Sequence, residues 1–103
     1  MTYTRVFTAL ADPTRRHIFE ALRDRPKTVG ELAKRQPVSR PAVSQHLKVL
    51  EAAGLVSVEP RGNRRLYLIK RDGLEALRDY LDKFWTDVLS AYDEEISHRA
   101  KIK

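Results

Sequence analysis

The stretch Val38 to Gly54, VSRPAVSQHLKVLEAAG, has the pattern of one amphipathic helix with a defined start and a defined end. Ser39 is a natural N-cap, because its hydroxyl can accept a hydrogen bond from a free amide in the first turn. Val38 and Val43 occupy the positions of a hydrophobic staple around that cap. Gly54 supplies the left-handed residue that commonly follows a helix. We therefore predict a helix from Ser39 to Ala53.

This helix has one apolar and one polar side. Val43, Leu47 and Leu50 recur at i, i+4 and i+7, which places them on the side that packs against a core. The other side carries residues suited to contact DNA. These residues are Ser39, Arg40, Pro41, Ser44, Gln45 and Lys48.

Short polar side chains near a helix N-terminus suit the reading of base edges in the major groove. Gln45 can form two hydrogen bonds with an adenine, and Arg40 can address a guanine. Lys48 lies farther along the helix and is expected to meet a phosphate. The alternative is that this polar side is only a solvated surface, which would be the better interpretation of an isolated amphipathic helix. The short helix before it and the hairpin after it favour DNA recognition.

A short helix precedes the recognition candidate. Thr28 and Glu31 form a capping box that begins a helix reaching about Arg35, and Gln36 with Pro37 interrupts it. A short helix, a tight connection and a longer capped helix make a helix-turn-helix, here residues 28–54.

Two further helices are predicted before this unit. The first runs from about Thr4 to Ala11. Asp12 as N-cap and Pro13 at the first helical position begin the second, which Arg25 and Pro26 are expected to end.

Four polar residues beside apolar stripes have open roles. Arg15 and Arg16 are candidates for phosphate contacts, although Arg16 can instead pair with Glu20 at i+4. His17 and His46 lie at the edges of apolar stripes, where a lone histidine is more often structural than catalytic. For His46 we expect packing or a backbone hydrogen bond.

A β-hairpin, the wing, is predicted at residues 55–69. Leu55 to Glu59 and Arg65 to Ile69 are β-favouring runs, joined by residues 60–64, whose glycine and asparagine permit a turn. Arginines on a narrow turn suit the minor groove and its flanking phosphates, whereas a soluble hairpin tip is the alternative. The predicted DNA contacts here are Arg61, Asn63, Arg64 and Arg65.

Asp72, followed by Glu75, is expected to cap a last helix over residues 73–99 with a broad apolar stripe. One small core needs less apolar surface than this helix carries, so part of it is assigned to a second subunit. The alternative is a helix that only completes the monomer core. The predicted dimer interface comprises Tyr3, Phe7, Leu77, Leu81, Phe84, Trp85, Val88 and Tyr92.

A twofold dimer places its two recognition helices in successive major grooves, about 34 to 36 Å apart. It predicts an operator with inverted-repeat symmetry. The fold class is mainly α with a small β-hairpin, in the order α-α-α-α-β-β-α, as a single domain over residues 1–103.

Composition supports this assignment. The 103 residues include 20 Lys and Arg against 14 Asp and Glu, a net charge of +6, which favours a polyanionic partner such as double-stranded DNA. Cysteine is absent, which excludes disulfides, thiolate metal ligands and cysteine nucleophiles. No segment approaches the roughly 18 to 20 apolar residues of a membrane span. We expect a cytoplasmic protein without a membrane partner.

Catalysis is not expected. Ser39, Ser44 and His46 lie on one helix, but no acidic residue is placed to orient the histidine, and a chain this short offers little room for a substrate cleft.

The runs LADPTRRHIFEAL, SRPAVSQHLKVLEAAGLV and EPRGNRRLYLI resemble the ArsR/SmtB family of winged helix-turn-helix repressors over nearly the whole chain. The resemblance implies a dimer formed by the first and last helices, a Ser39 to Ala53 helix in the major groove and a hairpin wing. It also implies that the protein is a repressor, and some members of the family repress their own operon.

The chain departs from that family at its sensor. Family members often carry a cysteine pair on the helix-turn-helix, or Asp and His ligands on the last helix. Without cysteine, Glu94, Glu95 and His98 are the best remaining cluster, and they contain a single histidine. We therefore predict no metal and no cofactor, and an unknown effector or partner protein supplies any signal. A metal-responsive repressor and a protein-docking winged module are the alternatives.

Overall fold

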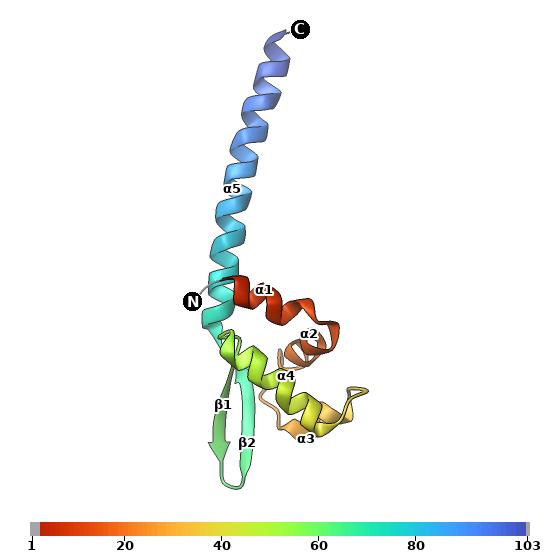
Figure 1. The fold of residues 1–103 in the computed structure, drawn as a ribbon. Coiled ribbons are helices and arrows are strands. Elements are labelled where there is room, and N and C mark those ends of the chain that lie inside the picture. The colour runs from red at the N-terminus through yellow and green to blue at the C-terminus, as the bar shows by residue number, and fades with distance from the viewer. Residues whose placement is uncertain (1–2, 103) are drawn as a thin grey trace.

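The computed structural model describes residues 3–102, and the side chains of residues 3–96. Four short helices and a hairpin form a body from which one long helix projects (Figure 1), so the molecule measures 70 × 25 × 22 Å. The order is the predicted α-α-α-α-β-β-α. The elements are α1 (Tyr3–Ala11), α2 (Pro13–Glu20), α3 (Val29–Lys34), α4 (Arg40–Ala52), β1 (Val56–Arg61), β2 (Arg64–Ile69) and α5 (Arg71–Ile102).

The predicted N-caps of three helices are confirmed. A carboxylate oxygen of Asp12 accepts from the Arg15 amide at 2.8 Å, which begins α2. Thr28 and Glu31 form the reciprocal capping box of α3. The Ser39 hydroxyl accepts from the Ala42 amide at 3.3 Å, which begins α4. Each cap satisfies an amide that has no partner inside its own helix.

The core lies among the short helices and the start of β1. Val43, Leu47 and Leu50 lie on one side of α4 and are completely buried there. The remaining buried apolar residues come from α1, α2, α3 and the start of β1, and from the segments that follow α2 and α4. They are Val6, Ala9, Ile18, Leu22, Leu32, Ala53, Leu55 and Val56.

The wing is a two-stranded antiparallel hairpin whose register runs from Val56 opposite Ile69 to Arg61 opposite Arg64. The predicted five-residue connection was too long, because both strands extend to a two-residue turn. Gly62, with φ of 60°, is the first turn residue, and a two-residue turn of this kind needs a positive φ there. Pro60 is tolerated within β1 because a hairpin strand has a free edge.

The predicted bounds of two helices were wrong. Helix α2 ends at Glu20 and not at Arg25 and Pro26, since the amides of Leu22 and Arg23 bond three residues back in tighter turns. Helix α5 runs from Arg71 to Ile102, beyond both ends of the predicted 73–99, so Asp72 is not its N-cap. Asp72 lies in the first turn, where its carboxylate is 3.6 Å from the Lys70 ammonium. A negative charge at this end interacts favourably with the helix dipole.

The first turn of α5 is fixed to the body. The Lys70 amide donates to Leu55 O and the Gly73 amide to Gly54 O, both at 2.9 Å. Leu74 and Leu77 pack against the core, and α5 leaves the body beyond Tyr80, whose ring contacts α1 (Figure 1). Within residues 3–102, none of the helices combines the length and the hydropathy of a membrane span.

Candidate nucleic-acid interface

The outer face of α4 presents polar side chains, as the sequence predicts. Arg40, Pro41, Gln45 and Lys48 are exposed and Ser44 is half-buried. The Ser39 hydroxyl accepts a hydrogen bond from the Ala42 amide in the N-cap. Ser39 therefore stabilises the first turn of α4, which presents Arg40 and Pro41. A helix with a buried apolar side and an exposed polar side can approach the major groove without losing its core contacts.

Three arginines from two elements meet beside α3. Arg40 from the start of α4 and Arg64 and Arg65 from β2 line one open groove, together with residues 28–30. The approach is close because residue 30 is a glycine. A Cβ at Gly30 would lie 3.0 Å from Nη2 of Arg40. The recognition helix and the wing therefore offer their cations to the same stretch of surface, while Arg61 and Asn63 are exposed at the wing tip.

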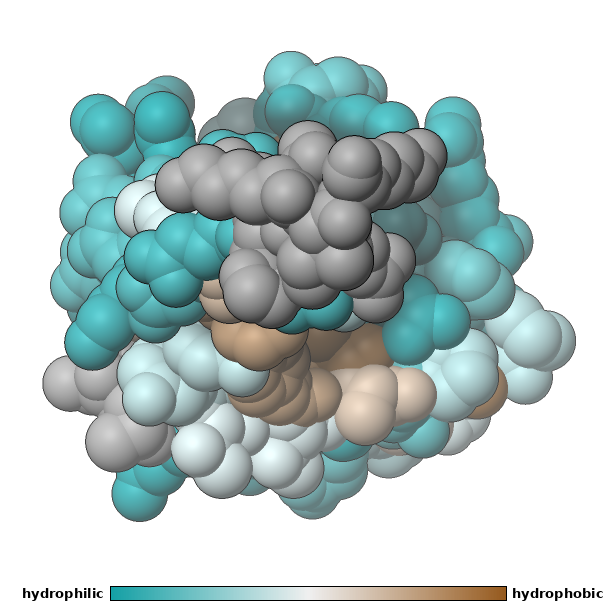
Figure 2. Space-filling model, turned by 90° about the horizontal axis from the view of Figure 1, so that it is seen from above, coloured by the Kyte–Doolittle hydropathy of each residue, from teal (hydrophilic) through white to brown (hydrophobic). Residues whose placement is uncertain are grey.

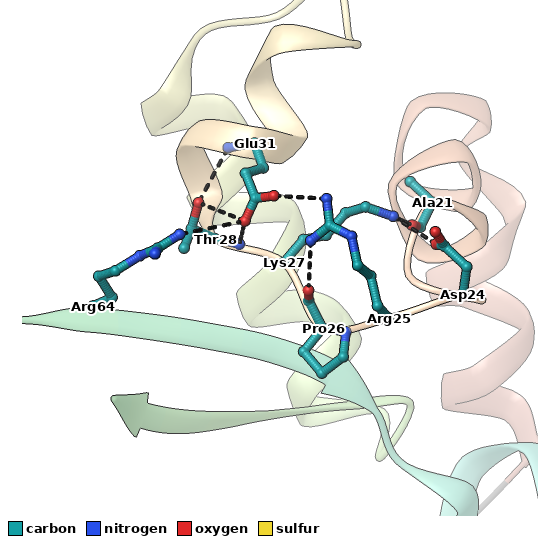
Figure 3. Close-up of polar contacts among 8 residues, drawn as sticks. All are labelled: Ala21, Asp24, Arg25, Pro26, Lys27, Thr28, Glu31 and Arg64. Carbon is teal, nitrogen blue, oxygen red and sulfur yellow. Dashed lines mark hydrogen bonds and ion pairs between the residues drawn. The ribbon is translucent and has the colours of Figure 1, made fainter. Parts of the chain in front are cut away.

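A carboxylate connects the helix-turn-helix with the wing (Figure 3). Oε2 of Glu31 is 2.8 Å from Arg25, and Oε1 is 3.7 Å from Arg64 and accepts from the Thr28 amide at 3.1 Å. The Arg25 guanidinium and the Thr28 amide lower the pKa of Glu31 to about 2. Glu31 is therefore an anion at every pH at which the wing arginines meet DNA.

The sequence indicated only half of this arrangement. The capping box predicted the bond from Glu31 to the Thr28 backbone, since both partners lie within one turn. Its ion pairs with Arg25 and Arg64 depend on how the connecting segment and the wing fold onto α3, which local spacing does not encode.

Lys27 holds the same region from the inside. Its backbone forms an isolated antiparallel bridge with Tyr67 of β2, with N–H to O distances of 3.0 and 2.8 Å. Its side chain is buried, and Nζ donates to Ala21 O and, at 2.6 Å, to Asp24. The Lys27 ammonium also lowers the pKa of Asp24. Lysine is rarely buried, so this contact could not be expected from the residue type.

Arg15 and Arg16 make internal contacts. Arg16 Nη1 donates to Leu10 O at 2.7 Å, and no Arg16–Glu20 ion pair occurs among the described residues. Arg15 Nε donates to Ala9 O at 2.6 Å, and Nη1 lies 3.3 Å from Nδ1 of His46. His46 was expected to pack or to bond a backbone group; it is half-buried, and its Nδ1 contacts the side chain of Arg15.

The predicted dimer interface forms an apolar surface on α1 and α5. Its exposed members include Phe84 and Trp85, with 55% and 60% of their surface accessible, whereas Leu77 and Val88 are half-buried. In the view from above, apolar residues gather in one patch beside a polar surround (Figure 2). The remaining predicted members, all exposed, are Tyr3, Phe7, Leu81 and Tyr92.

Tyr80 also belongs to this surface, although it was not predicted. Its ring centroid lies 4.6 Å from that of Tyr3, 5.4 Å from Phe7 and 6.3 Å from Phe84. It therefore joins α1 to α5 through aromatic contacts. Tyr80 is three residues after Leu77 and four before Phe84, so the helical spacing that defines the apolar stripe includes it and could have identified it.

No three His, Cys, Asp or Glu residues gather as a metal site in the part of the chain that the structure describes. Of the predicted remaining cluster, Glu94 and Glu95 are exposed on α5, and the side chain of His98 lies outside the described residues.

Sequence comparison identifies relatives across most of the chain. A family model described as a helix-turn-helix domain matches residues 10–59. The chain is 56% identical over 92 residues to the HTH-type transcriptional regulator Rv2034 of Mycobacterium tuberculosis, covering 89% of this chain and 86% of that protein. It is 30% identical over 82 residues to the transcriptional repressor SdpR of Bacillus subtilis, covering 76% of this chain and 91% of that protein.

Solved structures with a similar fold are also transcriptional regulators. An ArsR-like transcriptional regulator from Rhodococcus sp. RHA1 matches with a TM-score of 0.73 and 33% identity, over 89% of this chain and 90% of that one. The homodimeric winged helix-turn-helix DNA-binding domain of Mb0332 from Mycobacterium bovis matches with a TM-score of 0.64 and 28% identity, over 82% and 77%. The chain belongs to the ArsR/SmtB-type family of helix-turn-helix transcriptional regulators.

Proposed function

We propose that this DNA-binding transcriptional regulator acts as a homodimeric repressor on an operator of inverted-repeat symmetry. Helix α4 of each subunit enters a major groove, and the wing lies against the adjacent minor groove and its phosphates. Repression follows from occupancy of the operator, without a chemical step.

The meeting of Arg40, Arg64 and Arg65 in one groove carries the proposal. Like charges repel, so exposed arginines gathered from the recognition helix and the wing favour a polyanion that neutralises them together. DNA backbone phosphates lie beside both grooves, which matches a surface composed of a helix end and a hairpin. Arg61 and Asn63 extend this surface to the wing tip.

Base recognition is assigned to the exposed face of α4. Gln45 has the donor and acceptor that adenine requires, and Arg40 the paired donors that guanine requires. Ser44 and Pro41 lie between them and permit close approach. Lys48 lies one turn beyond Ser44 and is assigned to a phosphate, which positions the helix without reading sequence.

The apolar surface of α1 and α5 supports a homodimer. Tyr92 and Ile96 near the far end of α5 are 66% and 61% exposed, and Leu81 in its middle is 50% exposed. A helix with apolar residues exposed along its length is stabilised when a second apolar surface covers it and removes these residues from water. The related domain of Mb0332 is homodimeric, and we propose the same assembly here.

A direct test is selection of duplexes from random-sequence DNA with the purified protein. We expect the selected fragments to share an inverted repeat whose half-sites lie one helical turn apart. With six to ten phosphate contacts, affinity would fall by about 10³ to 10⁵ between 50 and 200 mM salt. Selected fragments without a common sequence, or affinity independent of salt, would contradict the proposal.

A protein-docking module is the second candidate function, and the exposed aromatic surface of α5 favours it. In that case α5 would bind a different protein and DNA would not bind. Sedimentation analysis together with a gel shift on random duplex DNA separates the two. A monomer without DNA affinity would support docking, and a dimer that binds DNA would support the repressor.

A further inference from the structure

Arg15 connects the proposed dimerisation helix α1 with the middle of the recognition helix α4. Nε donates to Ala9 O at 2.6 Å and Nη2 to Thr8 O at 3.3 Å, and both carbonyls belong to the last four of α1. Carbonyls at a helix C-terminus have no partner in their own helix, so they are available to a guanidinium. A third nitrogen, Nη1, lies 3.3 Å from Nδ1 of His46.

The chemistry of this contact fixes the direction of the hydrogen bond. A guanidinium has donors only, so Nδ1 of His46 must accept and the ring proton of a neutral imidazole must be on Nε2. The Arg15 backbone is fixed as well, since its amide donates to the carboxylate of Asp12 at 2.8 Å. One residue is thus held at its backbone by the cap of α2 and at its side chain by α1 and α4.

The position of this link gives it a consequence for DNA binding. Helix α1 carries Tyr3 and Phe7, whose rings contact Tyr80 of α5 on the proposed dimer surface. His46 is adjacent to Gln45, the residue assigned to base reading. The Arg15 side chain therefore lies between the surface that sets the position of the second subunit and the surface that reads the bases.

We infer that Arg15 is a positioning residue that fixes the recognition helix relative to the dimer interface and thereby sets the half-site spacing the dimer accepts. This inference rests on the proposed function. In a twofold dimer, any change in the angle between α1 and α4 is applied twice, once in each subunit. Binding groups must be held within about 0.5 Å of their productive positions, so a loosened link costs base contacts before it costs phosphate contacts.

The neighbouring Arg16 provides a matched control. Arg16 Nη1 also donates to a carbonyl of the last turn of α1, Leu10 O at 2.7 Å, and Arg16 makes no hydrogen bond or ion pair with α4 among the described residues. Arg16→Gln and Arg15→Gln each remove one positive charge and bonding to the end of α1, one bond for Arg16 and two for Arg15, but only Arg15→Gln removes the link to His46. His46→Phe removes the acceptor of that hydrogen bond, retains an aromatic ring at position 46 and leaves Arg15 unchanged.

The experiment uses the full chain and a duplex selected from random-sequence DNA by the wild type. The half-site spacing of this duplex is varied by one and two base pairs in each direction. Affinities for this series and for a random duplex are measured at several salt concentrations, with the unfolding midpoint and sedimentation mass of every variant.

We expect Arg15→Gln and His46→Phe to lose roughly 2- to 30-fold in affinity for the best spacing, and to show a flatter dependence on spacing. Arg16→Gln keeps the wild-type optimum, and the random-duplex affinities of the two arginine variants agree. If Arg15→Gln fails to fold, His46→Phe alone decides the test.

Three results have distinct meanings. A sharp optimum retained in Arg15→Gln and His46→Phe overturns the inference and leaves the proposed function intact. A salt slope shallower by about one in Arg15→Gln than in Arg16→Gln shows a phosphate contact, which also overturns it. A wild type that selects no duplex overturns the proposed function and the inference with it.

Discussion

Gln45 and Lys48 are both exposed on α4, yet the proposed complex gives them different roles. A side chain that bonds a base edge contributes only on the matching sequence, whereas one that bonds a phosphate contributes on every sequence. Exposure alone does not separate these roles, and binding measured on two kinds of DNA does.

Replacing Gln45 with alanine is expected to weaken binding to the selected operator by about 1 to 3 kcal/mol and to leave binding to random duplex DNA nearly unchanged. Lys48→Ala is expected to weaken both and to lower the salt slope by about one. Gel-shift titrations on the two duplexes measure both effects. Equal losses on specific and random DNA for Gln45→Ala would rule out its assignment to a base.

Glu31 gives the fold a defined dependence on pH. Its folded-state pKa of about 2 lies below the ordinary 4.5, because Arg25 and the Thr28 amide stabilise the carboxylate. A depressed pKa stabilises the fold above the unfolded pKa, and this stabilisation is lost as the pH falls from about 4.5 to about 2. We expect Glu31→Gln to be less stable than the wild type at pH 7, and the difference to shrink over this window.

Denaturant unfolding at a series of pH values checks this expectation. Glu59→Gln is the control, since it also removes one carboxylate, and Glu59 is exposed on β1 and in none of the ion pairs among the described residues. A stability difference between Glu31→Gln and the wild type that stays constant from pH 7 to pH 2 would show that the ion pairs of Glu31 do not stabilise the fold.

At the scale of elements, the placement of α5 depends on how closely its first turn approaches the end of α4. A Cβ at Gly73 would lie 2.9 Å from Ala53 O and 3.0 Å from Gly54 O. These backbone oxygens are held in place, because Gly54 follows α4 with φ of 74° and its carbonyl accepts the Gly73 amide. Glycine at position 73 therefore permits the contact that orients α5.

Gly73→Ala should therefore destabilise the protein. Alanine gains about 1 kcal/mol of helix propensity, but overpacking against fixed atoms costs about 1 to 3 kcal/mol, so a net loss of up to about 2 kcal/mol is expected. Gly30→Ala is the control, since its Cβ would meet only the flexible end of Arg40. Thermal unfolding of both variants decides the matter, and equal stability would show that α5 can shift without cost.

The elements differ in how far the sequence predicts them. Helix starts at Asp12, Thr28 and Ser39 were predictable because a cap and its partner amide lie within three residues. The end of α2 and the start of α5 were not, because the segment after α2 is shaped by the bridge of Lys27 to the wing and α5 by its contact with Gly54. Long-range contacts leave no mark in local spacing.

The candidate site shows the same division. The exposed face of α4 follows from the period of its apolar residues, so its members could be named in advance. That Arg40 lies beside Arg64 and Arg65, and that Glu31 contacts Arg64, depends on the hairpin folding toward α3. Arg15 was a candidate phosphate contact for the same reason, since the sequence does not show that its side chain turns inward to α1 and His46.

For the whole molecule, the proposed second subunit would cover the exposed apolar residues of the long α5. Trp85→Glu would place an unpaired charge in the proposed interface, at a cost of about 3 kcal/mol or more, which raises the dimer dissociation constant at least about 100-fold. Thr86→Glu adds the same charge at the next exposed position of α5. Sedimentation equilibrium should give a monomer for the first variant and a dimer for the second.

Dissociation to the same extent in both variants would show that added charge anywhere on α5 disrupts assembly. An unchanged dimer in Trp85→Glu would place the interface elsewhere on the molecule.

One dimer is expected to hold two recognition helices one turn of DNA apart, and binding to operators of altered phase tests this arrangement. Affinity is measured for the selected inverted repeat and for the same repeat with about five base pairs, half a helical turn, inserted between its halves. The insertion is expected to reduce affinity to that of a single half-site, because the second recognition helix then faces the wrong side of the duplex. Equal affinity for the two duplexes would contradict it, because the two subunits would then read DNA independently.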